Sequence, residues 1–188
     1  MIEKIWDKDL AAPPIVVMGS AHVTRGRRRL NRATTLYRQS RYIVTHDKIT
    51  RFTLWEEGEA YQEGITSGRQ ITVHSGQYLT LIVLICADAL DENIQKLLAD
   101  LRPHYLVIPC MTPKTEAFEN LAQHMVDIAQ SAVLVANGPQ DQDARTQSAI
   151  FARPIRGRSV IAGRPSAVPG VTLLAPEKDD LNVPETDF

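Results

Sequence analysis

The middle of the chain alternates between continuous apolar runs and segments with helical spacing. Residues 78–85, 105–109 and 131–136 are almost wholly apolar, which is typical of strands buried on both faces. Between these runs, apolar residues recur every three or four positions over 92–101 and 118–128, which predicts two amphipathic helices. This strand–helix–strand–helix–strand order predicts an α/β layer with adjacent, parallel strands.

Residues at the ends of the two helices support this prediction. Asp91 is a favourable cap for the first helix, because a short carboxylate accepts the free N–H groups of the first turn. Pro103 ends that helix. Thr112 and Pro113 form a favourable cap and first-turn pair, so we expect the second helix to begin there.

The segments before this layer predict further β structure. A short strand is expected over 15–18, ended by a Gly-Ser pair, and a strand pair over 33–44. Residues 47–68 are polar and acidic and predict a long loop without structure of its own, a kind of segment that is often functional. Residues 70–73 are expected to pair with 78–85 as a hairpin.

Beyond the third apolar run, short β segments alternate with proline and glycine. These segments are expected over 148–152, 158–162 and 171–174. We expect residues 1–176 to form a single domain and residues 177–188 to form an acidic, loosely held tail.

The composition is that of an ordinary globular protein of 188 residues, with 44% hydrophobic and 23% charged residues. Its net charge of −1 gives no global electrostatic reason to expect binding to nucleic acid or to a membrane. We find no signal peptide and no apolar stretch of membrane-spanning length, and a reduced state suits both cysteines, so we expect a cytoplasmic protein. The five histidines show no ligand spacing, and we expect neither a metal nor a cofactor.

A local basic cluster follows the first predicted strand. It consists of Arg25, Arg27, Arg28, Arg29 and Arg32. We interpret it as a solvated loop rather than a phosphate site, because exposed arginine is the usual case.

Cys86 ends the first apolar run, just before the first predicted helix. Open α/β sheets place their chemistry at the carboxyl ends of strands, and a thiol near a helix N-terminus is favoured as the thiolate. A cysteine hydrolase also needs a cation and an acid or base. Lys48 at the start of the long loop is the candidate cation, and Glu57 lies in the acidic stretch that follows. Asp88 is suited to anchor the turn by accepting backbone N–H bonds.

Each of these residues also has a plainer interpretation. Cys86 and Cys110 would serve as small core hydrophobes, Lys48 as a surface lysine and Glu57 as a solvated acid. Asn137 would cap the end of a strand. Single residues therefore do not define a site, and their order along the chain carries more information.

The chain carries, in this order, Ile-Val-Val-Met-Gly-Ser-Ala-His at 15–22 followed by Asn31, Thr-His-Asp-Lys-Ile-Thr at 45–50, Glu57 before Gly64, Leu-Ile-Cys-Ala-Asp at 84–88, Val-Ile-Pro-Cys-Met at 107–111, Val-Leu-Val-Ala-Asn at 133–137 and Ser-Ala-Ile-Phe at 148–151. This ordered set, from Pro14 to Pro154, resembles the nitrilase superfamily of carbon–nitrogen hydrolases. The resemblance implies an α/β fold, a nitrilase-like α-β-β-α sandwich, and a homo-oligomer.

The resemblance also implies cysteine-dependent hydrolysis of an amide-type bond in a small amide or nitrile, through a thioester. Cys86 would be the nucleophile, Lys48 would stabilise the oxyanion, and Glu57 would orient groups or assist proton transfer. The residues expected to contact the substrate are Ala87, Cys110, Met111 and Asn137.

The chain departs from the family pattern on its amino-terminal side. The family's first glutamate, its general base, lies on a strand–helix unit before the Gly-Ser strand, and the residues before Pro13 are too few for such a unit. We therefore expect an incomplete sandwich, either as a fragment or as part of a larger protein. A different alignment would place Val44 in the lysine position and His46 in the histidine position.

Two other functions remain open at this point. The missing glutamate favours a catalytically inactive nitrilase-like module for binding or dimerisation. An isochorismatase-like cysteine hydrolase would also use a cysteine at a strand end, but the β-rich segments over 148–174 argue against its doubly wound sheet.

Overall fold

The structure is a computed structural model that describes residues 15–37, 40–76, 79–112, 115–138, 148–155 and 158–162. The expected strand at 171–174 and the expected tail at 177–188 lie outside these residues. Within the described ranges, no helix is long and apolar enough to cross a membrane.

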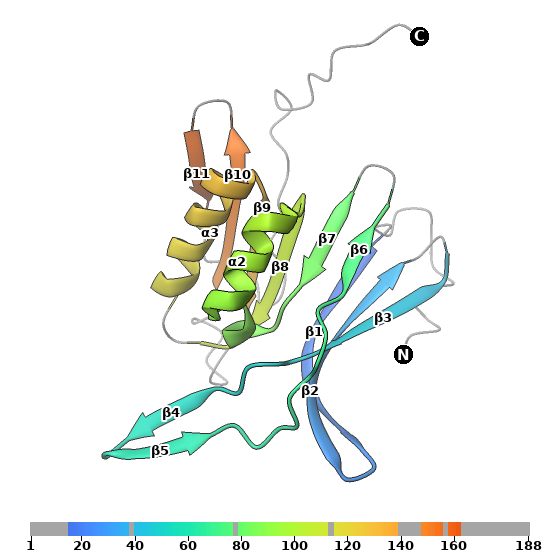
Figure 1. Ribbon diagram of the computed structural model, residues 1–188, viewed down its shortest axis with the longest axis vertical. Coiled ribbons are helices and arrows are strands. Elements are labelled where there is room, and N and C mark those ends of the chain that lie inside the picture. Colours follow the sequence, from blue (N-terminus) through green and yellow to red (C-terminus); the bar gives the residue numbers. More distant parts are fainter. Residues whose placement is uncertain are drawn as a thin grey trace, which may run out of the picture.

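A mixed six-stranded sheet forms the centre of the molecule (Figure 1), in the order β11-β10-β9-β8-β7-β6. The strands are β6 (Val73–Ser75), β7 (Thr80–Val83), β8 (Tyr105–Cys110), β9 (Ala132–Asn137), β10 (Ser148–Ile155) and β11 (Arg158–Ala162). The central strands β7, β8 and β9 are parallel, as predicted, and β6, β10 and β11 pair antiparallel with their neighbours. The predicted hairpin before Cys86 is confirmed as the β6–β7 pair.

Two helices, α2 (Glu92–Leu101) and α3 (Glu116–Ala129), cover one face of this sheet. The Asp91 cap is confirmed, because its Oδ1 accepts the N–H groups of Asn93 at 2.9 Å and Ile94 at 3.1 Å. The predicted start of the second helix at Thr112 is wrong. That helix begins at Glu116, and the N–H of Thr112 instead donates to Asn137 Oδ1.

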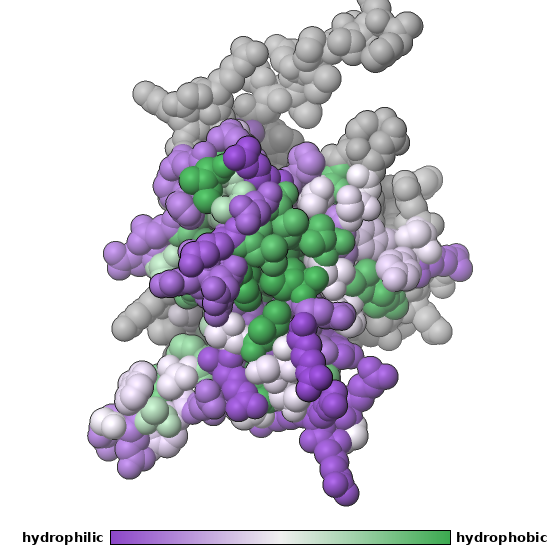
Figure 2. Space-filling model, in the orientation of Figure 1, coloured by the Kyte–Doolittle hydropathy of each residue, from purple (hydrophilic) through white to green (hydrophobic). Residues whose placement is uncertain are grey.

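The helices pack on the sheet through the inner part of their apolar stripes. In α2, Ile94 and Leu98 are buried, whereas Leu97 and Leu101 are each 40% exposed. Figure 2 accordingly shows hydrophobic side chains at the surface over α2 and the strands beside it. The predicted apolar stripe is therefore present, but only the residues along its centre are buried in the core.

A second sheet packs against the opposite face of the large sheet. It contains β1 (Ile15–Arg25), β2 (Arg28–Tyr37) and β3 (Tyr42–Asp47) in sequence order, all antiparallel. Side chains of β7 alternate between the two layers: Ile82 joins the core under the helices, and Leu81 and Val83 join the core between the sheets. The described residues thus form three layers: helices, large sheet, small sheet.

The first strand is longer than predicted. A register shift between Met18 and Ser20 introduces a β-bulge, and pairing with β2 then continues to Arg25. The Gly-Ser pair that was expected to end the strand is absorbed by this bulge.

The predicted structureless loop contains a hairpin, β4 (Thr53–Glu56) and β5 (Glu59–Gln62), which projects from the body of the molecule (Figure 1). Glu57 and Gly58 form its two-residue turn, both with positive φ (51° and 86°), the conformation that suits the twist of a tight hairpin. The strands carry exposed side chains, so hydrophobic alternation gave no sign of them.

Candidate active site at the end of β7

Cys86 stands at a tight turn between the buried end of β7 and the short 3₁₀ helix η1 (Cys86–Leu90). Its φ is +49°, a left-handed conformation that costs a residue with a Cβ on the order of 1 kcal/mol or more. The turn is closed by the N–H of Asp88, which donates to the carbonyl of Ile85 at 3.0 Å. Such a strand-to-helix turn presents its first side chain at the end of the sheet, where the sequence placed the nucleophile.

The groups around Cys86 shift the pKa of its thiol in opposite directions. Burial is the largest influence and raises its pKa, and the charge of Glu63 adds to this. The charge of Lys48 and backbone N–H bonds from Met111 and Ala87 lower the pKa in part. The expected low-pKa thiolate is therefore wrong: α2 begins six positions later, at Glu92, and desolvation outweighs the favourable contacts.

Asp88 is fully buried and joins this turn to the segment that carries Lys48. Its Oδ1 accepts the N–H groups of Ile49 at 2.9 Å and Thr50 at 2.6 Å. Its Oδ2 lies 2.9 Å from Nε2 of buried His46 and accepts a long bond from Ile85. Because these donors flank Lys48, Asp88 fixes the backbone of that lysine relative to Cys86. The sequence predicted only the turn-anchoring part of this role.

Lys48 is 3% exposed and forms a close ion pair with Glu63, with Nζ and Oε2 2.5 Å apart. Burial acts to raise the pKa of Glu63, but hydrogen bonds from Lys48, the Phe52 N–H and the Asn31 amide, together with the Lys48 charge, lower it overall. His22 Nε2 lies 3.4 Å from the other oxygen of Glu63, Oε1. Glu63 is therefore an ionised carboxylate with partners on both oxygens.

The structure does not place Glu57 in the site. It is exposed at the turn of the projecting β4–β5 hairpin, and the acid beside Lys48 is Glu63, 15 residues further along. Sequence reasoning missed Glu63 because the hairpin was read as an unstructured acidic loop, in which no acid stands out. A weak signal was present: Glu63 is the last acid of that stretch, just before buried Ile65.

Three of the four predicted substrate-contacting residues interact with Cys86, and the fourth, Asn137, contacts Cys110 and Thr112 instead. Ala87 and Met111 direct their backbone N–H groups at the Cys86 sulfur. Cys110 is buried, and its Sγ donates to Asn137 Oδ1 at 3.5 Å. The Asn137 amide also bonds both backbone groups of Thr112, so it holds the segment that carries the Met111 N–H.

The alternative alignment also has a structural outcome. Lys48, not Val44, pairs with the partly buried Glu63, and His46 contacts Asp88. Together, a cation, two N–H donors and a sulfur converge at one strand end, an arrangement suited to stabilising negative charge on an oxygen or on the sulfur.

Comparison with solved structures shows that the fold of the chain is similar to a known one. The chain superposes on Saccharomyces cerevisiae Nit3, a member of branch 10 of the nitrilase superfamily, with a TM-score of 0.60 and 18% identity, over 79% of this chain and 55% of that one. A mutant amidase from Nesterenkonia sp. AN1, with acrylamide added at its active-site cysteine, gives 0.59 and 16%, over 79% and 59%. A CN-hydrolase superfamily protein from Xanthomonas campestris, with an arsenic adduct in its active site, gives 0.56 and 14%, over 81% and 63%.

These matches establish the fold and not the activity. The chain has a mixed α/β fold that matches part of the nitrilase fold, and it spans between 55% and 63% of the length of these three proteins. No family model and no curated protein matches it in sequence.

Proposed function

We propose that the chain carries the nucleophile site of a cysteine-dependent carbon–nitrogen hydrolase that acts on a small amide or nitrile. The observation that supports this most is the convergence of Lys48 and the N–H groups of Ala87 and Met111 on Cys86. In an inert core cysteine, neither a strained turn nor a buried cation would be needed.

In the proposed reaction, Cys86 Sγ loses its proton and attacks the carbonyl carbon of the amide. Lys48 and the Ala87 N–H stabilise the negative charge that develops on the carbonyl oxygen. The C–N bond breaks, the amine leaves with a proton, and a thioester remains on Cys86. Water then attacks the thioester, releases the carboxylic acid and restores the thiol.

Proton transfer is the demanding part of this scheme. Glu63 is the acid nearest to Lys48, but its lowered pKa makes it a poor base, so we assign it to holding Lys48 in place. Without a further base, the rate would fall by on the order of 10²–10⁴.

A second candidate is a nitrilase-like module that binds a partner and does not turn over substrate. The raised pKa of Cys86, with no base assigned among the described residues, favours it. For either candidate we propose a homo-oligomer, by analogy with the fold. We also propose a reducing, cytoplasmic location, which agrees with two neighbouring free thiols.

The test combines labelling with turnover. Intact and peptide mass after incubation with acrylamide should show an adduct on Cys86 and not on Cys110. Ammonia release from short aliphatic amides and nitriles should be lost in Cys86→Ala and kept in Cys110→Ala. Labelling of Cys86 without ammonia release would support the second candidate, and an unlabelled Cys86 would overturn the hydrolase proposal.

A further inference from the structure

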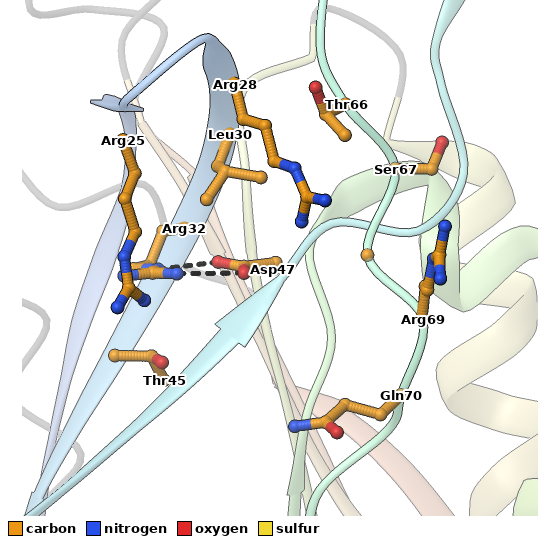
Figure 3. Close-up of a pocket in the computed structure, with 11 residues that line it drawn as sticks. Arg25, Arg28, Leu30, Arg32, Thr45, Asp47, Thr66, Ser67, Arg69 and Gln70 are labelled. Atoms are coloured by element: carbon orange, nitrogen blue, oxygen red, sulfur yellow. Dashed lines mark hydrogen bonds and ion pairs between the residues drawn. The ribbon is translucent and has the colours of Figure 1, made fainter.

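A cavity of about 630 Å³ lies outside the Cys86 site, between the β1–β2 hairpin and the segment 66–70. Figure 3 shows Arg25, Arg28 and Arg32 projecting from the hairpin on one side of this cavity, with residues 66–70 on the other. The cavity does not belong to the Cys86 site, because Arg32 and Asn31 are successive on β2 and point to opposite faces. Asn31 contacts Glu63, and Arg32 lines the cavity.

The lining carries an excess of positive charge. Four arginines line the cavity. Its single acid, Asp47, is neutralised by Arg32, whose guanidinium donates two hydrogen bonds to the carboxylate, at 2.6 and 2.9 Å. Among the described residues, Arg25, Arg28 and Arg69 form no ion pair, so three positive charges remain. Arg25 and Arg28 are directly opposite each other in the β1–β2 register, where like charges repel. An anion in the cavity would relieve this repulsion.

The neutral residues that line the cavity also suit an anionic ligand. Thr45, Thr66 and Ser67 contribute hydroxyl groups, and Gln70 contributes an amide. Guanidinium and hydroxyl donors around one space are the groups that bind phosphate oxygens.

Backbone contacts hold the two sides of the cavity together. The N–H of Thr66 donates to the carbonyl of Arg29, and that of Gly68 to the carbonyl of Lys48, each at 2.7 Å. A Cβ on Gly68 would lie 2.1 Å from the carbonyl oxygen of Asp47, so the chain packs too closely there for any other residue. These contacts fix the backbone on both sides of the cavity, whereas the side chains of Arg25, Arg28 and Arg69 are exposed.

We propose that this cavity binds a small polyphosphate, such as the triphosphate group of a nucleotide or inorganic triphosphate. Its volume is in the range of small-molecule sites, and three arginines that form no ion pair with any described residue favour a ligand with several negative charges, such as linked phosphates. Arg25, Arg27, Arg28 and Arg29 are exposed, as the interpretation of the basic cluster as solvated predicts, and the proposal adds a ligand to part of that cluster. Arg25, Arg28 and Arg32 line the cavity, whereas Arg27 and Arg29 do not.

The test is titration calorimetry with inorganic triphosphate in about 0.15 M salt, where weak surface attraction is screened. It uses the full chain carrying Cys86→Ala, so that its outcome does not depend on hydrolysis. Saturable binding is expected, and the pair Arg28→Gln and Arg69→Gln should weaken it at least about tenfold. The matched control is Arg27→Gln, in the same hairpin turn but outside the cavity, which should change the affinity less than about twofold.

Two results would overturn the proposal. One is the absence of saturable binding. The other is tighter binding of a single-stranded RNA than of triphosphate, weakened as much by Arg27→Gln as by the cavity pair, which would indicate a nucleic-acid surface instead.

Discussion

The parallel strands β7 and β8 each lead to a cysteine whose pKa is raised by burial, but the two thiols differ in backbone conformation and in the groups that surround them. Cys110 lies in regular strand, is 7% exposed and bonds to Asn137, and burial together with the nearby Cys86 raises its pKa to about 12. Cys86 lies at the start of a left-handed turn, with a buried cation and two N–H groups directed at it. Two similar apolar runs are thus each followed by a cysteine, one with a structural role and one with groups around it that can stabilise negative charge. The difference comes from the residues that surround the carboxyl end of each strand.

The largest effect is expected at Asp88, which links the Cys86 turn to the Lys48 segment. Asp88→Ala would leave several buried donors without an acceptor and should lower the free energy of unfolding by about 3 to 5 kcal/mol. Chemical denaturation measures this. Asp100→Ala, at an exposed position of α2, is the matched control and should change it by less than about 0.5 kcal/mol.

A positioning role for Asp88 also predicts a kinetic effect. Below its melting temperature, Asp88→Ala should alkylate more slowly at Cys86, and Asp88→Asn, which keeps an acceptor oxygen, should recover part of the rate. An unchanged rate in folded Asp88→Ala would mean that Asp88 contributes only to stability.

The next effect concerns pH and the charge of Lys48. Because the thiolate is the reactive form and the Cys86 pKa is raised, alkylation by iodoacetamide should still be rising with pH at pH 9. Lys48→Gln removes a charge that lowers this pKa, so the profile should move to higher pH, and the rate at pH 8 should fall by about threefold to tenfold. Lys96→Gln, on exposed α2 surface, should leave the profile unchanged. A plateau below pH 8 would contradict the raised pKa.

The smallest expected effect is a change in stability that distinguishes Glu63 from Glu57. Glu63→Gln should destabilise the protein by about 1 to 3 kcal/mol, because it weakens charged hydrogen bonds to Lys48 and to the Phe52 N–H. Glu57→Gln, at the exposed hairpin turn, should change stability by less than about 0.5 kcal/mol. Equal effects, measured by denaturation, would argue against the Lys48–Glu63 pair.

The sequence predicted the features that depend on residues close together along the chain better than those that depend on distant residues. The parallel strands β7 to β9 and the Asp91 cap were predictable, because periodicity and capping act over a few residues. The β1 bulge and the start of α3 were not, because each depends on a distant partner, and the β4–β5 hairpin was not, because its exposed side chains show no hydrophobic alternation. The bulge needs β2, and Thr112 is drawn away from α3 by Asn137 on β9.

The sequence alone determined that Cys86 would follow a buried strand, because a run of apolar residues is buried in the core. It also made Lys48 the cation to consider, because of its place in the order of motifs along the chain. Only the tertiary structure decided the state of that thiol, the choice of Glu63 over Glu57 and the division of the arginine cluster between a cavity and solvent. The reason is physical: burial and charge depend on which groups lie nearby in space. Lys48 and Glu63, for example, are 15 residues apart along the chain, and Ile49 and Asp88 are 39 apart.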